Sequence, residues 1–281
     1  MLKELPVQES PNGKPAAACG SCTSCAPDLL KRHGLDVSGF DFVVALAGNP
    51  NTGKSTIFNA LTGLRQHVGN WPGKTVMRAE GAFRGGNVKY KLVDLPGTYS
   101  LLSQSTDEEI ARDFLLFGRP DVTVVVADAT CLERNLNLVL QVLEITDRAV
   151  VALNLLDEAE RNGIQVDARA LARDLGVPVV PMAARHGKGI RELVAAIDKV
   201  ARDEYPSKPF HAKRLPAELE AAVQDLITKI ETSFPRLPNA RWIALRLLEG
   251  DPSVIREVEE GTLGESVHSV SVERARAEAS A

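Results

Sequence analysis

A glycine-rich run at residues 48–55 carries the most specific chemistry in the sequence. It reads Gly48-Asn49-Pro50-Asn51-Thr52-Gly53-Lys54-Ser55, which fits the phosphate-loop pattern G-x-x-x-x-G-K-[ST]. Such glycines let the backbone point its N–H groups at phosphate oxygens, while Lys54 places a cation on the β- and γ-phosphates. Ser55 offers a hydroxyl to Mg²⁺, and the helix that continues through Thr56 adds its positive end. We therefore predict a nucleotide phosphate site, against the alternative of a chance glycine turn.

A second polar group follows a predicted strand over 88–94. It reads Asp94-Leu95-Pro96-Gly97. A carboxylate at that strand end can hold the Mg²⁺ shell through water, and Gly97 can donate its N–H to a γ-phosphate. Asp, Pro and Gly are also common turn residues, so a simple turn is the alternative.

A third polar group ends the apolar strand predicted over 149–154 and reads Asn154-Leu155-Leu156-Asp157. A carboxylate here can accept hydrogen bonds from the N1–H and N2 amino groups of guanine. Adenine lacks this pair of donors and would leave the charge unpaired, which disfavours it. The alternative role of Asp157 is to cap a helix. All three groups lie at the carboxyl ends of strands, where α/β sheets bind ligands.

The elements that must position these groups alternate between strands and helices. Strands are predicted over 42–47, 76–83, 88–94, 121–128, 149–154 and 177–181, with a hairpin turn at 84–87. Several are continuous apolar runs, which is typical of strands buried on both faces. After residue 205 only helical spacing is found. The predicted fold is α/β, a mostly parallel P-loop sheet with one antiparallel edge strand, plus a small all-α domain.

Composition narrows the classes of protein further. The 281 residues carry a net charge of −4 without a basic stripe, which argues against a nucleic-acid partner. The longest apolar runs, 42–48 and 122–129, are strand-sized and far short of the roughly 20 residues of a membrane helix. We expect a flexible Cys-containing extension (1–40), a nucleotide-binding domain (41–203), a helical domain (205–262) and a polar tail (263–281).

Four longer stretches resemble a known family. They are Gly69-Asn70-Trp71-Pro72-Gly73-Lys74-Thr75-Val76, then 94–101, 128–136 and 242–251. The three nucleotide loops look like those of translation-factor-type GTPases. From about residue 42 to residue 260 the chain resembles, more narrowly, the cytoplasmic N-terminal part of the ferrous iron transport protein B (FeoB) family. The resemblance implies a P-loop GTPase (G) domain followed by a helical domain that favours bound GDP.

The resemblance also implies a function and partners. It implies a switch domain that hydrolyses GTP slowly and regulates Fe(II) uptake, with GTP or GDP, Mg²⁺ and K⁺ as cofactors. The family continues into a membrane permease of the same parent chain, so this soluble portion would lie at the cytoplasmic face of the inner membrane. A homo-oligomer is a further expected partner.

Residue roles carry over at matching positions. Thr75, beside Gly73 and Lys74 in the first mobile loop, would reach Mg²⁺ in the GTP state, with Ser55 and Asp94 as the other ligands. Asn51 would coordinate K⁺ beside the phosphates, where a cation replaces an arginine finger. The implied catalytic residues are Asn51, Lys54, Thr75 and Gly97. The implied guanine contacts are Asn154, Leu155, Leu156 and Asp157, with Ala183, Ala184 and Arg185 under the base.

Three positions depart from the usual GTPase pattern. Leu155 stands where most GTPases carry Lys, as is usual in the FeoB family, so one stacking contact on the base is missing. Ala183 replaces a more usual Ser or Thr, which should loosen the base loop slightly. Thr98 stands where Ras-type enzymes have a catalytic Gln, and we therefore predict slow intrinsic turnover.

Cys19, Cys22 and Cys25 form a dense cluster of thiols. Three thiolates plus one more ligand could hold Zn²⁺ or an iron–sulfur cluster, against the alternative of free thiols in a tail. Two other functions stay open. One is a free-standing GTPase that binds RNA or ribosomes, although the slight acidic excess of residues 205–281 argues against it. The other is a metal-sensing adaptor that uses the N-terminal cysteines.

Overall fold

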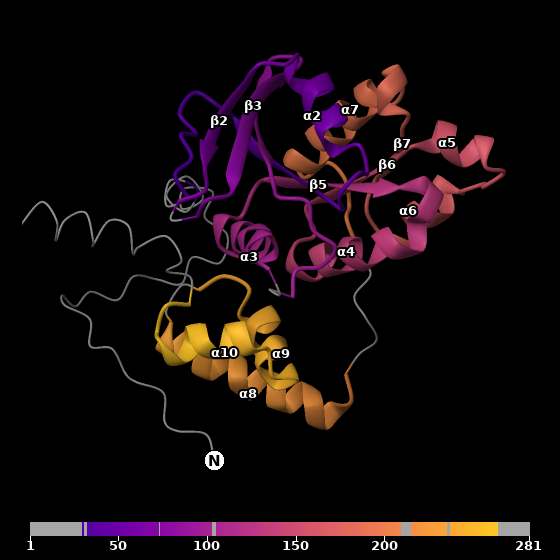
Figure 1. Cartoon of the computed structure of the whole chain (residues 1–281). Helices are drawn as coiled ribbons and strands as arrows, with labels where there is room; N and C mark the ends of the chain where they lie inside the picture. Colours follow the sequence, from indigo (N-terminus) through magenta and orange to yellow (C-terminus); the bar gives the residue numbers. More distant parts are fainter. Residues whose placement is uncertain are drawn as a thin grey trace, which may run out of the picture.

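A seven-stranded sheet with helices on both faces organises the chain (Figure 1). The computed structural model describes residues 30, 33–72, 74–102, 105–208, 215–234 and 237–263. The strand order is β2-β3-β4-β1-β5-β6-β7, and only the β2–β3 and β3–β4 pairings are antiparallel. The predicted mostly parallel α/β sheet is therefore confirmed. The strands are β1 (Phe42–Gly48), β2 (Gln66–Asn70), β3 (Met77–Gly85), β4 (Val88–Asp94), β5 (Val122–Asp128), β6 (Ala149–Asn154) and β7 (Val179–Pro181).

Strand β2 is the one strand that the sequence pattern did not predict. Its residues, QHVGN, are mostly polar, and Val68 is half exposed, so no apolar alternation marks it. It pairs antiparallel with β3, with Val68 opposite Ala79 and Asn70 opposite Met77. This pairing makes β2 the outer edge of the sheet and places β3 one strand further in.

Alternation along β1 decides which helices cover which face of the sheet, because successive side chains of a strand point to opposite sides. Val44 and Leu46 pack with helices α2 (Lys54–Thr62) and α7 (Ile190–Ala201). Val43 and Ala45 pack on the other face, with α3 (Thr106–Asp113), the π-helical turn η1 (Phe114–Gly118) and α4 (Leu132–Ile145). Helices α5 (Leu156–Arg161) and α6 (Ala168–Leu175) lie toward β7 (Figure 1).

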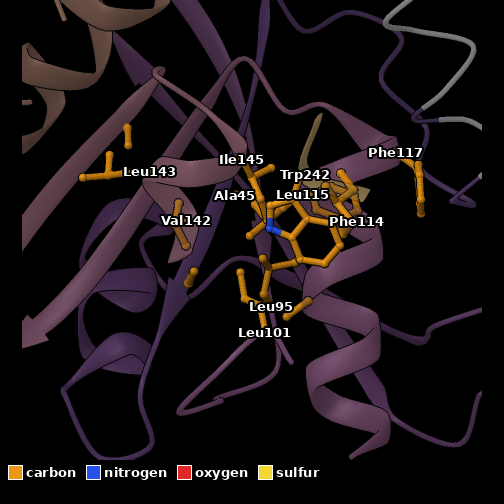
Figure 2. Packing of buried hydrophobic residues seen from close by; sticks show 14 of the residues in the cluster. Ala45, Leu95, Leu101, Phe114, Leu115, Phe117, Val142, Leu143, Ile145 and Trp242 are labelled. Atoms are coloured by element: carbon orange, nitrogen blue, oxygen red, sulfur yellow. The ribbon is translucent and has the colours of Figure 1, made fainter. Parts of the chain in front are cut away.

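Three helices after residue 215 form a further layer beside α3 and α4 (Figure 1). They are α8 (Ala217–Ser233), α9 (Ala240–Glu249) and α10 (Pro252–Glu259). Trp242 of α9 is only 5% exposed and belongs to the same buried cluster as Phe114 and Leu115 (Figure 2). Within the described ranges, no helix combines the length and the apolarity needed to cross a membrane.

Residues that precede β1 also belong to the core. Leu30 and Leu35 are each 2% exposed and pack in the cluster that contains Trp71 and Phe114. Arg78 of β3 donates hydrogen bonds to the carbonyl oxygens of His33 and Gly34, at 2.6 and 3.0 Å. The end of the extension is therefore packed against the sheet rather than free.

His33 should make the stability of the protein depend on pH. Burial, and then the charge of Arg78, lower the pKa of its imidazole from 6.5 to about 4. Between these values the unfolded chain binds more protons than the folded one. The free energy of unfolding should therefore fall, by up to about 3 kcal/mol, as the pH drops from about 6.5 to about 4.

Urea unfolding at pH 7 and at pH 4.5 checks this expectation, with His33→Gln as the variant that cannot titrate. The wild type should lose distinctly more stability than the variant over this interval. Equal losses in the two proteins would show that His33 does not carry the pH dependence.

Candidate nucleotide-binding site

The phosphate loop lies between β1 and α2, as the sequence predicts. Asn51 and Gly53 have positive φ angles of 65° and 85°, which turn the backbone sharply into the helix. The buried Thr52 hydroxyl donates to the carbonyl oxygen of Asn49 at 2.9 Å and closes the turn. A side chain at Gly53 would overlap the amide nitrogen of Asn154, so only glycine fits there. The loop is therefore preshaped, with the positive end of α2 available to an anion.

Lys54 and Asp94 form an ion pair across the site. Nζ of Lys54 lies 2.5 Å from Oδ1 of Asp94 and 2.7 Å from the carbonyl oxygen of Leu95. Burial raises the pKa of Asp94, and the charge of Lys54 opposes that shift. A phosphate would compete with the carboxylate for Lys54, because both are anionic acceptors. The ion pair therefore keeps the Lys54 ammonium and the Asp94 carboxylate together next to the phosphate loop.

The loop at 94–97 packs directly on the phosphate loop. A Cβ on Gly97 would stand 3.5 Å from Cα of Pro50, and the N–H of Thr98 donates to the carbonyl oxygen of Gly48 at 3.3 Å. Thr98 itself is only 4% exposed. The residue at the position of a catalytic Gln is thus short and buried.

Asn154 joins the phosphate loop to the loop at 183–185. Its side-chain nitrogen donates to the carbonyl oxygen of Thr52 at 2.9 Å, and its side-chain oxygen accepts from the N–H of Ala184 at 3.0 Å. The side chain is 1% exposed. The phosphate loop and the loop at 183–185, which lie about 130 residues apart in the sequence, are thereby both bound to one side chain at the end of β6. Sequence reasoning placed Asn154 at the base but did not predict this bridging contact.

Asp157 lies next to this junction, in the first turn of α5. A left-handed Leu155, with φ of 61°, turns the chain from β6 into the helix. The carboxylate of Asp157 lies 3.3 Å from Nε2 of His186 and 3.4 Å from Arg161, and its side chain is 23% exposed. Asp157 is not the N-terminal cap, so the carboxylate is directed to side chains and solvent. His186 was missed by sequence reasoning; its only signal is its position directly after Arg185.

A cavity of about 360 Å³ lies beside the phosphate loop. Its wall includes the polar side chains of Lys54, Ser55 and Asp94 together with the apolar side chains of Phe58 and Met77. Ser55 and Asp94 offer hydroxyl and carboxylate oxygens, the hard donors that Mg²⁺ prefers. The chemistry of these two residues therefore fits the predicted Mg²⁺ ligands.

Thr75 lies apart from that pair, in the loop that joins β2 to β3. The N–H of Trp71 donates to the carbonyl oxygen of Val76 at 3.0 Å and closes this loop. Nζ of Lys74 lies 3.1 Å from the Glu109 carboxylate at the start of α3. Among the described residues, Thr75 is exposed and does not contribute to the cavity wall. The predicted ligands Ser55 and Asp94 are thus brought together, and the third is not.

The remaining predicted residues differ in where they lie. Gly73 and the cysteines at 19, 22 and 25 lie outside the described residues. Arg185 is exposed, whereas Ala183 and Ala184 are each 5% exposed. In the part of the chain that the structure describes, no group of three or more His, Cys, Asp or Glu side chains is arranged to hold a metal ion.

Comparison with known families decides the identity of the fold. Residues 42–197 match the family of ferrous iron transport protein B, and residues 216–280 match that of the FeoB cytosolic helical domain. The chain belongs to the ferrous iron transport protein B family. The first match alone covers more than half of the chain.

Relatives with this name are longer than the chain. The Fe(2+) transporters FeoB of Shigella flexneri and Escherichia coli K12 are each 45% identical over 212 residues, which is 74% of this chain and 27% of theirs. The chain thus spans about a quarter of the length of these FeoB relatives.

Solved FeoB structures share the fold. The cytosolic domain of L. pneumophila FeoB is 36% identical, with a TM-score of 0.70, and the match covers 79% of this chain and 87% of that one. The cytosolic domain of T. maritima FeoB in GMPPNP form is 38% identical, with a TM-score of 0.70 and coverage of 78% and 85%.

Proposed function

We propose that the chain binds guanine nucleotides and slowly hydrolyses GTP to GDP and phosphate. The observation that carries this proposal is the convergence of three loops at one end of the sheet. Lys54 pairs with Asp94, and Asn154 ties the phosphate loop to Ala184 beside Asp157. The T. maritima relative, solved in GDP and GMPPNP forms, supports a guanine nucleotide as the ligand.

The base and the phosphates take different parts of this site. The backbone N–H groups of the loop at 48–56, in which Pro50 alone has none, and the Lys54 ammonium bind the phosphates, and Gly97 donates its N–H to the γ-phosphate. Asp157 accepts the N1–H and N2 amino hydrogens of guanine, with 154–156 beside the base and 183–185 under it. Bound Mg²⁺ would neutralise charge on the β- and γ-phosphate oxygens, held by Ser55, Asp94 and, in the GTP state, Thr75.

Hydrolysis requires a water to attack the γ-phosphorus while the bond to the β–γ bridging oxygen breaks. Lys54 and the Gly97 N–H stabilise the negative charge that develops on the phosphoryl oxygens. Thr98 is buried and too short to orient the attacking water. Turnover by this chain alone is therefore slow, and Asn51, exposed on the loop, can direct its amide oxygen to K⁺ beside the phosphates.

Potassium should stimulate hydrolysis if Asn51 has this role. Phosphate release from GTP should be at least about tenfold faster in KCl than in NaCl. Both salts are used at about 0.15 M, the physiological ionic strength. Asn51→Ala should remove the difference without lowering GDP affinity by more than a few fold. Equal wild-type rates in the two salts would contradict the role of K⁺, whereas no release in either would contradict the GTPase itself.

The two parts of the chain form a switch in this proposal. The G domain spans 41–203 and the helical domain 205–262, and the helical domain favours bound GDP. The switch regulates Fe(II) uptake by a membrane permease of the parent protein, at the cytoplasmic face of the inner membrane.

A buried ion-pair network supports coupling between the helical domain and the second nucleotide loop. Arg112, in the helix that follows loop 94–97, is 1% exposed. It donates to Ser253 at 2.8 Å and to Glu257 at 2.6 Å on α10, and to the neighbouring Asp113 at 2.8 Å. Burial raises the pKa of Glu257, and Arg112 opposes that shift. Breaking one partner of such a buried pair is costly, so the contact fixes α10 to α3.

Glu257→Ala should therefore speed GDP release. Loss of the carboxylate leaves Arg112 buried and weakens the contact that connects the helical domain to α3, and we expect dissociation at least about fivefold faster. Stopped-flow displacement of a fluorescent GDP analogue measures the rate. Glu220→Ala is the matched control, because Glu220 pairs with Arg241 inside the helical domain at 2.6 Å. Identical rates for wild type and Glu257→Ala would contradict the coupling.

A further inference from the structure

Residues 30 and 33–37, which we call the N-terminal strap, precede the part of the chain that matches the FeoB family at residue 42. We propose that this strap holds the loop at 71–76 away from the Mg²⁺ ligands and so disfavours the GTP-bound state. The inference rests on the proposed function, in which Thr75 reaches Mg²⁺ only with GTP bound.

The strap contacts the base of that loop through Arg78. This residue is 8% exposed, and its guanidinium donates to the backbone carbonyls of His33 and Gly34 at 2.6 and 3.0 Å. Its guanidinium also lies 5.4 Å from the centre of the Trp71 ring and 2.7 Å from Glu80. One buried cation thus connects the strap to the residue at which the loop begins.

Ring packing also connects the strap to Phe114, at the end of the helix that follows loop 94–97. The His33 and Trp71 rings each lie 5.4 Å from the ring of Phe114, both edge to face. Phe114 begins η1, directly after α3. The strap therefore lies in one cluster with the first mobile loop and with the helix that follows loop 94–97.

Trp71 is held in this cluster by packing rather than by its own polar contact. It is 3% exposed, and its buried indole N–H has no hydrogen-bond partner among the residues that the structure describes. A buried unpaired donor costs about 1–3 kcal/mol, so this position needs compensation from neighbouring groups. Arg78, Phe114 and the strap leucines, Leu30 and Leu35, supply that packing.

This arrangement opposes movement of Thr75. Trp71 is buried and precedes Thr75 by four residues, so while Trp71 stays in place the Cα of Thr75 can lie at most about 14 Å from that of Trp71. The exposed Thr75 does not line the cavity of Ser55 and Asp94 in the described structure. A ligand shifts a conformational equilibrium only by its differential affinity for the two states. Part of the binding free energy of GTP is therefore needed to move the loop away from the strap, whereas GDP binds without that movement.

Two glycines provide a matched test. Gly34 has φ of +71°, and a Cβ there would lie 3.2 Å from Pro72 and 3.3 Å from Arg78; the methyl groups of valine would reach further into both. Gly39 has φ of +77°, and no atom of the described part of the chain lies within 4 Å of an added Cβ. Gly34→Val and Gly39→Val therefore carry the same kind of backbone strain, but only the first pushes the strap off the loop.

The experiment is calorimetric titration of the whole chain with GDP and with GMPPNP, both with Mg²⁺. We expect Gly34→Val to raise the affinity for GMPPNP relative to GDP by at least about fivefold, and Gly39→Val to leave the ratio unchanged. His33→Ala, which removes the buried imidazole and its ring contact with Phe114 but keeps the backbone carbonyl that Arg78 binds, should change the ratio in the same direction. An unchanged ratio in both Gly34→Val and His33→Ala, with both nucleotides bound, would overturn the strap proposal. Loss of all guanine-nucleotide binding by the wild type would instead overturn the proposed function.

Discussion

Replacing Lys54 by Ala should lower the affinity for GDP and GTP at least about 100-fold. A charge-assisted contact with phosphate is among the strongest hydrogen bonds in proteins, worth about 1.5–3 kcal/mol. The change also leaves the half-buried Asp94 carboxylate without its cation, 2.5 Å from where Nζ stood, so that it repels the incoming phosphates. Titration calorimetry with Mg²⁺ present measures the loss.

Lys229→Ala is the control for this change. Lys229 also forms a lysine–aspartate pair, with Asp225 at 2.7 Å, but it lies on α8 in the helical layer. Its replacement should leave nucleotide affinity unchanged. Thermal unfolding separates a binding defect from a folding defect in Lys54→Ala. A folded Lys54→Ala protein with affinity within a few fold of wild type would refute the assignment of the phosphate loop.

Replacing Asp157 by Ala should remove the preference for guanine over adenine nucleotides. A site built to accept two hydrogen bonds from the ligand rejects a ligand without those donors by about 10⁴-fold, because the buried acceptor is left unpaired. We expect the GDP/ADP affinity ratio to fall at least about 100-fold, mainly through loss of GDP affinity. Asp157→Asn should shift the preference toward xanthine nucleotides, since its amide can donate to the C2 carbonyl of xanthine.

Glu158→Ala is the matched control for base recognition, because Glu158 is the next carboxylate on α5 and is exposed to a greater extent. The competition assay compares displacement of a fluorescent GDP analogue by GDP, ADP and XDP. If Asp157→Ala and Glu158→Ala both keep the wild-type GDP/ADP ratio, Asp157 does not contact the base.

The sheet could be predicted because its strands are buried on both faces. Strands β1, β5 and β6 are almost entirely apolar, and the apolar run alone marks them. Strand β2 escaped prediction because it lies at the edge with polar, exposed side chains. The π-helical turn at Phe114–Gly118 was not predicted either. Its first residue, Phe114, packs against the rings of Trp71 and His33, and these long-range contacts leave no local pattern in the sequence.

The site was predictable as three loops but not as a network. Spacing in the sequence identifies Lys54, Asp94 and Asp157 by the chemistry that each side chain can do. The bridging role of Asn154 depends on three segments that meet only in the folded sheet. His186 and Arg112 were likewise missed, because their partners lie on other elements and the motif positions do not include them.

The most direct test of the whole account is titration calorimetry of the unmodified chain with GDP and ADP in the presence of Mg²⁺. The account predicts one-to-one binding of GDP, with micromolar or tighter affinity, and binding of ADP at least about 100-fold weaker. No heat on addition of GDP, or equal affinity for the two nucleotides, would contradict the claim that Lys54 and Asp157 lie in one guanine-nucleotide site.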